Sequence, residues 1–217
     1  MATTRQGTFI TLEGVEGSGK TTQVERLADR LRYAGRTVVT TREPGGTPIS
    51  DRIRAVVLDQ RNNEIHPHTE ALLMCAARAQ LVHEVIRPAL DAGQVVLCDR
   101  YSDSTFAYQG YARGQDLATL RAINQFATSG LVPHLTILLD LPAEVGLQRR
   151  FRAARNAEEP TNRMDLFDTA FHQQVAEGYH ALAQADPDRW RLVDAQGSVD
   201  DVAAAVWETV AAFLDTS

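Results

Sequence analysis

A glycine-rich segment with a single lysine has the composition of a site that binds a nucleoside triphosphate. The segment matches the pattern G-x-x-x-x-G-K-[ST] and consists of Gly14, Val15, Glu16, Gly17, Ser18, Gly19, Lys20, Thr21 and Thr22. Glycines let successive backbone N–H groups turn towards an anion, and the N-terminus of a following helix adds positive charge. Lys20 is expected to reach the β- and γ-phosphates, and the Thr21 hydroxyl to hold Mg²⁺. Lys20 is also the only lysine of the chain, which indicates that this position needs a compact ammonium group.

Charged residues that follow apolar runs extend this prediction. Asp99 ends the run Val95–Cys98, where a carboxylate could hold Mg²⁺ or its water ligands against the phosphates; capping a helix is the alternative role. Arg100 follows directly and needs an anion, because a guanidinium beside a buried strand end is costly without one. Glu16 places a negative charge inside the glycine loop, where it could orient a basic lid residue or a metal-bound water, or face solvent.

Two further features involve arginine. Arg78 lies among apolar residues of a helical pattern, so we expect it either to form an ion pair in the core or to point into a cleft. Met74, one turn earlier, shares its face and by default packs in the core. The segment from about 149 to 165 is rich in arginine and contains the polar stretch 158–160. It is predicted to be a lid that excludes water and brings guanidinium groups to a transferring phosphoryl group. Its arginines are Arg149, Arg150, Arg152, Arg155 and Arg163.

The elements that must position these residues alternate between short apolar strands and amphipathic helices. Strands are expected at 8–12, 37–41, 94–99, 135–140 and 190–193. Helices are expected at 23–34, 48–58, 69–92, 104–111, 117–128, 143–155, up to about 185, and at 199–214. This alternation predicts an α/β fold with three layers, α/β/α, around a five-stranded parallel sheet. Ligands then gather at the carboxyl ends of the strands. No repeat or linker divides the chain, so residues 1–217 are expected to form a single domain.

Composition limits the partners. The net charge of −6 gives no basic field that would attract nucleic acid or a membrane surface. Cys75 and Cys98 lie in apolar runs without metal-ligand spacing, which indicates buried free thiols in a reducing compartment. No signal peptide or membrane-spanning stretch is recognisable, and a soluble, cytoplasmic protein is expected.

Taken together, these motifs resemble the bacterial thymidylate kinase family, within the nucleoside monophosphate kinases, over nearly the whole chain. The resemblance rests on the loop 14–22, the segment Arg42-Glu43-Pro44-Gly45-Gly46-Thr47, the segment Ala76-Ala77-Arg78, the run 99–110 (DRYSDSTFAYQG) and Asn162-Arg163-Met164-Asp165. It implies a P-loop kinase fold and transfer of the γ-phosphoryl group of ATP to dTMP, giving dTDP on the way to dTTP for DNA replication. It also implies Mg²⁺ as cofactor and a homodimer.

The resemblance also assigns roles to residues. It implies that Glu43 lies near the acceptor nucleotide, that Arg54 and Arg100 hold the phosphate of dTMP, and that Arg78 bonds the thymine edge. Thr105 and Gln109 would complete the polar contacts to the base, with Ser104 beside them, and Tyr108 would pack on the deoxyribose. Arg150, Arg155 and Arg163 would reach the ATP phosphates, as in members that carry this charge in the lid. Met74 departs from the family pattern, which usually has an aromatic ring there to stack on thymine.

Other functions fit parts of the pattern. Another nucleotide or nucleoside kinase on the same scaffold is the nearest alternative. A regulatory GTPase is a second, because residues 162–165 resemble the guanine-reading N-K-x-D pattern; they lack its lysine, however, and follow a polar loop where that motif follows a strand. A phosphate-loop ATPase that acts as a switch leaves the segments 42–47 and 99–110 without a role.

Overall fold

The structure, a computed structural model, describes residues 7–156 and 161–216 and is built around one parallel sheet. Its strands are β1 (Thr8–Glu13), β2 (Val38–Arg42), β3 (Val95–Asp99), β4 (Leu135–Asp140) and β5 (Trp190–Asp194). They are hydrogen-bonded in the order β2-β3-β1-β4-β5. Every residue of β3 and β4 except the last is buried, as expected for parallel strands covered on both faces. The predicted five-stranded parallel sheet is thus confirmed.

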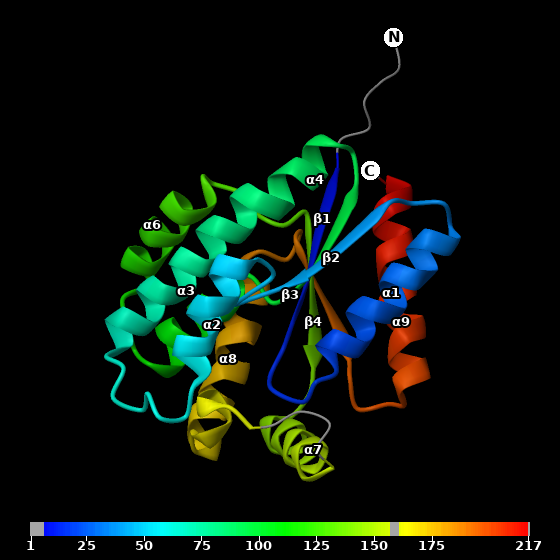
Figure 1. Cartoon of the computed structure of the whole chain (residues 1–217). Helices are drawn as coiled ribbons and strands as arrows, with labels where there is room; N and C mark the ends of the chain where they lie inside the picture. Colours follow the sequence, from blue (N-terminus) through cyan, green and yellow to red (C-terminus); the bar gives the residue numbers. More distant parts are fainter. Residues whose placement is uncertain (1–6, 157–160, 217) are drawn as a thin grey trace.

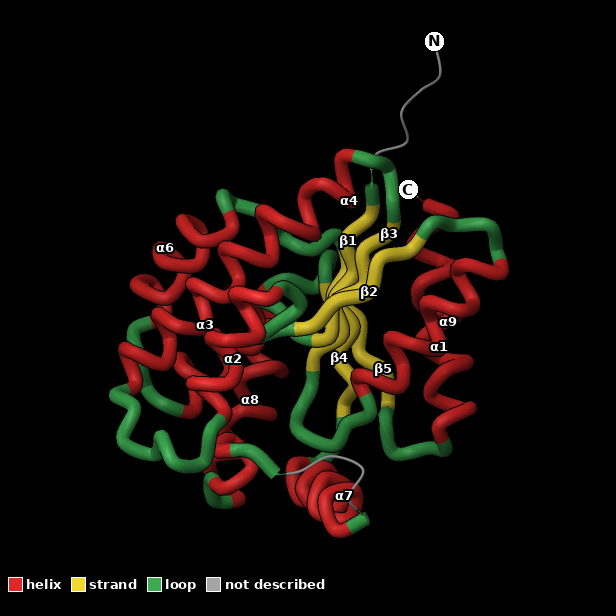
Figure 2. The backbone as a smooth tube through the Cα atoms, viewed as in Figure 1, coloured by secondary structure: helices red, strands yellow, loops and turns green. Residues whose placement is uncertain are grey.

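Helices cover both faces of the sheet, as Figures 1 and 2 show. On one side lie α1 (Lys20–Tyr33) and α9 (Val199–Thr216), which pack on each other. On the other side lie α2 (Pro48–Leu58), α3 (Pro67–Leu81), α6 (Leu117–Thr128) and α8 (Thr169–Ala185). The helix α7 (Ala143–Arg155) lies beyond the end of the sheet, and a short 3₁₀ turn follows at Arg163–Leu166. This is the three-layer arrangement that the sequence predicted.

The long helix expected at 69–92 is helical throughout but not uniform. It consists of α3, a π-helical segment at Val82–Ile86 and the short helix α4 (Arg87–Asp91). Pro88 lies at the start of α4 and has no N–H to donate to the preceding turn. The wider π turn accommodates this missing hydrogen bond, which a periodicity of 3.6 residues does not reveal.

A second π-helical segment carries several of the expected site residues. The helix α5 (Ser102–Thr105) continues into a π segment at Phe106–Ala112, and four consecutive residues of that segment, 107–110, are buried. A regular α-helix buries residues three or four positions apart rather than consecutive ones. The π geometry therefore lets the neighbours Tyr108 and Gln109 both face the interior. Gly110 fits because a Cβ there would lie 2.4 Å from a methyl group of Leu117.

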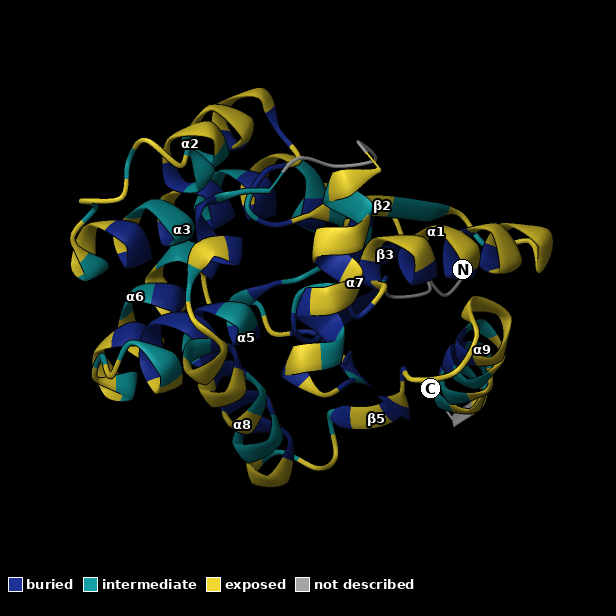
Figure 3. Cartoon of the chain, turned by 90° about the horizontal axis from the view of Figure 1, so that it is seen from below, coloured by how far each residue is buried: buried dark blue, intermediate teal, exposed yellow. Residues whose placement is uncertain are grey.

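The carboxyl ends of the strands meet at one edge of the sheet, which Figure 3 views from below. In the register of the sheet, Asp99 of β3 is level with Leu12 of β1 and Arg42 of β2. The segments after these three strands are therefore neighbours.

Three other expectations concern the rest of the chain. Cys75 and Cys98 are buried and free, as predicted. Among the described residues no helix is long and apolar enough to cross a membrane. The expected polar stretch 158–160 lies outside the described residues.

Candidate functional site

The glycine loop joins β1 to α1 and has the geometry of an anion-binding nest. Gly14, Gly17 and Gly19 have φ angles of 144°, 71° and 92°. A Cβ at Gly17 would lie 2.1 Å from the carbonyl oxygen of Gly146, so only glycine fits there. No side chain caps the first turn of α1, which leaves its backbone N–H groups available for an anion.

Lys20 folds back over this loop. Its Nζ donates to the carbonyl oxygens of Gly14 (3.1 Å) and Val15 (2.8 Å) and to Ser18 Oγ (3.3 Å). Burial and the positive charge of Arg100 lower the pKa of Lys20 to about 8. A phosphate group placed in the nest would reverse this shift, because a nearby anion favours the charged ammonium.

Thr21 and Asp99 form a pair at the start of α1. The Thr21 hydroxyl donates to Asp99 Oδ2 at 2.6 Å, and both residues line the same cavity. Their oxygen atoms suit Mg²⁺, which usually takes one or two protein ligands and completes its shell with water and phosphate. No cluster of three or more His, Cys, Asp or Glu that could hold a metal occurs in the described part of the chain.

Arg100 connects the loop with the segment that follows β3. Its φ angle of 68° is unusual for a residue with a side chain and is of the kind that concentrates at functional sites. Its Nη1 donates to Gly14 O (3.0 Å), Tyr179 OH (2.9 Å) and Ser104 Oγ (3.3 Å). Its Nη2 donates to Tyr108 OH at 3.1 Å. The guanidinium therefore spans from the phosphate loop to the π segment, where it can meet an anion between the two.

Glu16 is the ion-pair partner of Arg100, at 3.0 Å. Burial alone would raise the pKa of Glu16, but Arg100 and Lys20 together hold it at about 2. Tyr108 also donates to this carboxylate, at 3.2 Å. The structure thus pairs Glu16 with Arg100 at the end of β3, and the expected role of Glu16 in orienting a basic lid residue stays a prediction.

Arg78 lies in the interior and is only 2% exposed. Its Nε and Nη2 contact Glu43 Oε2 at 2.7 and 2.6 Å, and Nη2 also donates to Tyr101 O at 3.1 Å. Its Nη1 donates to Thr105 Oγ1 (3.0 Å) and Asn124 Oδ1 (2.5 Å). All five N–H groups are thus engaged. Both expectations for Arg78 hold in part, since it forms an ion pair in the core and also lines the cavity. To contact a base, it must exchange one of these hydrogen bonds for a bond to the base.

Two arginines of the expected lid are each held by a buried acid. Arg150 Nε donates to both oxygens of Asp165 at 3.1 Å, and its Nη2 lies 2.9 Å from Asp165 Oδ2. Arg163 donates to Val57 O at 2.9 Å and to Glu70 Oε2. Arg155, by contrast, is exposed. Of the three, only Arg150 lines the cavity, so the contact of Arg155 and Arg163 with ATP stays a prediction that requires these side chains to move.

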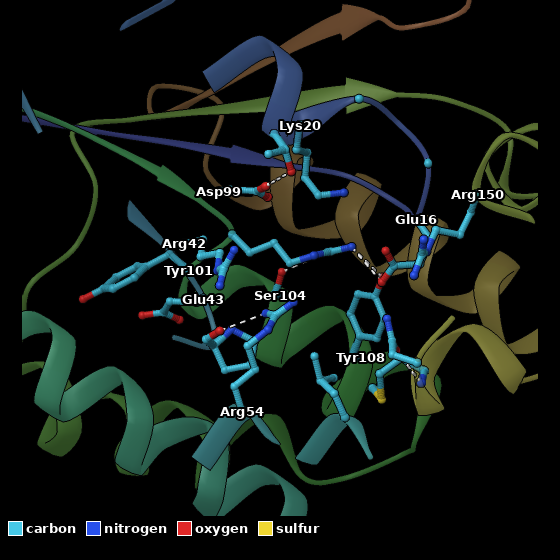
Figure 4. A pocket seen from close by; sticks show the side chains of 18 of the residues that line it. Glu16, Lys20, Arg42, Glu43, Arg54, Asp99, Tyr101, Ser104, Tyr108 and Arg150 are labelled. Atoms are coloured by element: carbon cyan, nitrogen blue, oxygen red, sulfur yellow. Dashed lines mark hydrogen bonds and ion pairs between the residues drawn. The ribbon is translucent and has the colours of Figure 1, made fainter. Parts of the chain in front are cut away.

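A cavity of about 800 Å³ brings most of the expected residues together. Figure 4 shows Lys20 and Asp99 at one end of it and Arg54 across from them. Of the residues expected at the site, those lining it are Glu16, Gly17, Gly19, Lys20, Thr21, Thr22, Glu43, Arg54, Met74, Arg78, Asp99, Arg100, Ser104, Thr105, Tyr108, Gln109 and Arg150. Those that do not line it are Gly14, Val15, Ser18, Arg155 and Arg163. The first three of these face Lys20 through the bonds described above.

Four polar residues of this region were not found from the sequence. Glu13, Glu70, Asn124 and Tyr179 are all buried and bond to residues that were expected at the site. Glu13 ends an apolar strand as Asp99 does, so the same signal could have identified it. The other three lie within helical patterns, where a buried polar residue cannot be told from a surface one.

Comparison with known proteins agrees with this geometry. The family profile described as thymidylate kinase matches residues 12–206. The chain belongs to the thymidylate kinase family. It is 52% identical over 208 residues to a thymidylate kinase of Syntrophotalea carbinolica, with 95% of this chain and 96% of that protein covered. It is 54% identical over 202 residues to one of Thermomicrobium roseum, with 93% of each covered.

A solved structure of the family has the same fold. The crystal structure of thymidylate kinase from Ehrlichia chaffeensis superposes with a TM-score of 0.75 at 29% identity and covers 94% of this chain and 99% of that one. The resemblance inferred from the sequence motifs is therefore confirmed, as is the P-loop kinase fold. A GTPase or ATPase switch is not supported.

Proposed function

We propose that this chain transfers the γ-phosphoryl group of ATP to the 5′-phosphate of dTMP, giving dTDP and ADP, inside the cavity at the carboxyl edge of the sheet. The activity follows from membership of the family. The observation that carries the arrangement is the position of Arg100, whose guanidinium bonds both to the phosphate loop at Gly14 and to Tyr108 in the π segment. The two nucleotides then approach from opposite ends, with their phosphates meeting near Arg100.

On the donor side, the backbone N–H groups of residues 14–19 and the ammonium of Lys20 hold the ATP phosphates. Thr21 and Asp99 would hold Mg²⁺, which when bound neutralises phosphate charge. Arg150, Arg155 and Arg163 add positive charge when the segment 149–165 closes over the site. This closure requires Arg163 to exchange its bond with Glu70 for one with phosphate.

On the acceptor side, Arg54 and Arg100 hold the phosphate of dTMP. Tyr108 packs on the deoxyribose, and Met74 lies against the base in place of an aromatic ring. The base edge is bonded by Thr105, Gln109 and, after exchange of a partner, Arg78. Glu43 supports this end through its ion pair with Arg78.

The chemical step needs little proton transfer, because the attacking group is already an anionic phosphate. The protein must instead overcome the repulsion between two highly charged substrates and align them for in-line transfer. Lys20 and Arg100 supply fixed positive charge in a partly buried cavity, where electrostatic interactions are stronger than in water.

Release of ADP in a coupled assay tests this function. We expect it to depend on dTMP and to be much slower with dUMP, dCMP, AMP or thymidine as the acceptor. Comparable rates with another acceptor would indicate a different kinase of the same scaffold. Hydrolysis of nucleotide that dTMP does not affect would contradict the proposal.

Three wider expectations are also part of the proposal. Residues 1–217 act as a single catalytic domain, because the family profile spans 12–206 and one sheet positions the whole site. The chain forms a homodimer; in support, Val56 on α2, Leu72 on α3 and Phe126 on α6 are exposed on neighbouring helices. Sedimentation analysis of wild type and Leu72→Glu tests this, and a monomeric wild-type chain would refute it. The expected cytoplasmic location stays a prediction.

A further inference from the structure

Glu70, in the first turn of α3, is fully buried and accepts hydrogen bonds from three side chains. Gln109 Nε2 donates to its Oε1 at 2.9 Å. Arg113 Nη2 donates to its Oε2 at 3.0 Å, and Arg163 Nη2 donates to the same oxygen. All three contacts come from N–H donors, so both oxygens of Glu70 act as acceptors.

This carboxylate decides which end of the Gln109 amide faces the cavity. A side-chain amide has a donor end, Nε2, and an acceptor end, Oε1. The donor end is taken by Glu70, since the opposite orientation would place two acceptor oxygens against each other. No described residue donates to Gln109 Oε1, and Gln109 lines the cavity. The end of the Gln109 amide that remains for a ligand is therefore the acceptor, Oε1.

We infer that Glu70 is a positioning residue that fixes the Gln109 amide, so that the site selects a base that donates an N–H group from ring atom N3. The inference rests on the proposed function, in which Gln109 contacts the base. Thymine carries a proton on N3 and can donate to Gln109 Oε1. Cytosine has an unprotonated N3, which would place an acceptor against an acceptor. Glu70 thus contributes to the preference for thymine over cytosine without contacting either base.

The two oxygens of Glu70 have separate partners, which gives the inference a sharp test. In Glu70→Gln the side chain keeps its shape, but only one of its ends is an acceptor. Arg113 and Arg163 donate to that end, and Arg113 continues to do so after Arg163 has moved to phosphate, so an N–H₂ group replaces Oε1 opposite Gln109. The Gln109 amide must then turn over to accept with Oε1, and it presents a donor to the base.

The experiment measures kcat/KM of Glu70→Gln for dTMP and for dCMP. We expect the ratio of dTMP to dCMP to fall at least about tenfold, the value of one well-placed hydrogen bond. Asp165→Asn is the matched control, because Asp165 is another buried carboxylate that holds a lid arginine but has no bond to Gln109. It is expected to lower kcat and leave the ratio unchanged. An unchanged ratio in Glu70→Gln, or an equal fall in Asp165→Asn, overturns the inference.

A double variant tests whether Glu70 acts through Gln109. In a Gln109→Met background, Glu70→Gln should leave the ratio where Gln109→Met put it; a further fall of similar size overturns the inference. Should Glu70→Gln not fold, competition on the wild-type enzyme decides. Two competitors are used, dCMP and a dTMP that is methylated on N3. Each should bind at least about tenfold more weakly than dTMP, and binding of either one as tightly as dTMP overturns the inference. Failure of the proposed function is distinguishable, since wild type would then show no dTMP-dependent release of ADP.

Discussion

Replacing Glu13 by glutamine is predicted to change how the stability of this protein depends on pH. Glu13 closes β1 and is 0% exposed. Its Oε1 accepts from the backbone N–H of Tyr101 at 2.7 Å, and its Oε2 accepts from Ser104 Oγ and Tyr179 OH at 2.7 and 2.9 Å. Burial, reinforced by Asp103, raises the pKa of Glu13 to about 7, although Arg100 and the hydrogen bonds from Ser104 and Tyr101 oppose the shift.

The size of the effect follows from linkage between protonation and folding. In the unfolded chain the carboxyl has its ordinary pKa of 4.5, whereas in the folded chain the pKa is about 7. Between these values the folded state keeps a proton that the unfolded state has released, so stability is lost as the pH rises through this window. At 1.36 kcal/mol for each pKa unit, the loss amounts to about 3 kcal/mol. A glutamine side chain does not titrate, so the Glu13→Gln variant does not lose stability in this way.

Urea unfolding at pH values from 4 to 8.5 measures the effect. The free energy of unfolding of Glu13→Gln, minus that of wild type, should rise by about 3 kcal/mol across this range. Glu64→Gln, at an exposed position, is the control and should run parallel to wild type. If the difference between Glu13→Gln and wild type stayed constant within about 0.5 kcal/mol, burial would not control the protonation of Glu13 and the reasoning would be refuted.

Four further predictions concern the site. Lys20→Ala should lower kcat about 10²–10³-fold with an unchanged circular dichroism spectrum, because a preorganised charge is lost; more than about a tenth of the wild-type kcat would contradict this. Amine-directed labelling, read by mass spectrometry, should modify Lys20 and the N-terminus, and ATP should protect Lys20. Met74→Phe should tighten dTMP binding several-fold through ring stacking, and calorimetry showing unchanged or weaker binding would disprove it. Arg100→Lys should raise KM for dTMP at least about tenfold, because an ammonium cannot replace the spread contacts of a guanidinium; an equal rise for ATP would argue against an acceptor role.

Local pattern was sufficient to predict the elements and the phosphate loop. The bounds of α2 and α6, Pro48–Leu58 and Leu117–Thr128, agree with the expected ranges. In both helices the start is set by neighbours in the chain, a proline in the first turn of α2 and the capping side chain of Asp116 in α6. The loop 14–22 was recognisable for the same reason, since its geometry depends on glycines close together in sequence. The π segments were not, because their hydrogen bonds depend on how the helices pack.

The sequence by itself thus determined the succession of strands and helices along the chain, the phosphate loop and the family, because each of these depends on residues close together in the sequence. Only the tertiary structure decided which buried polar groups pair with one another. Arg78 meets Glu43 and Asn124 from 35 and 46 residues away, and Glu13 meets Tyr179 across 166 residues. A buried charge requires a partner, but nothing in the local sequence specifies which one, because the choice depends on the elements that the fold places side by side. For the same reason, only the structure brings Glu70 to Gln109, and with it the orientation of the amide that faces the base.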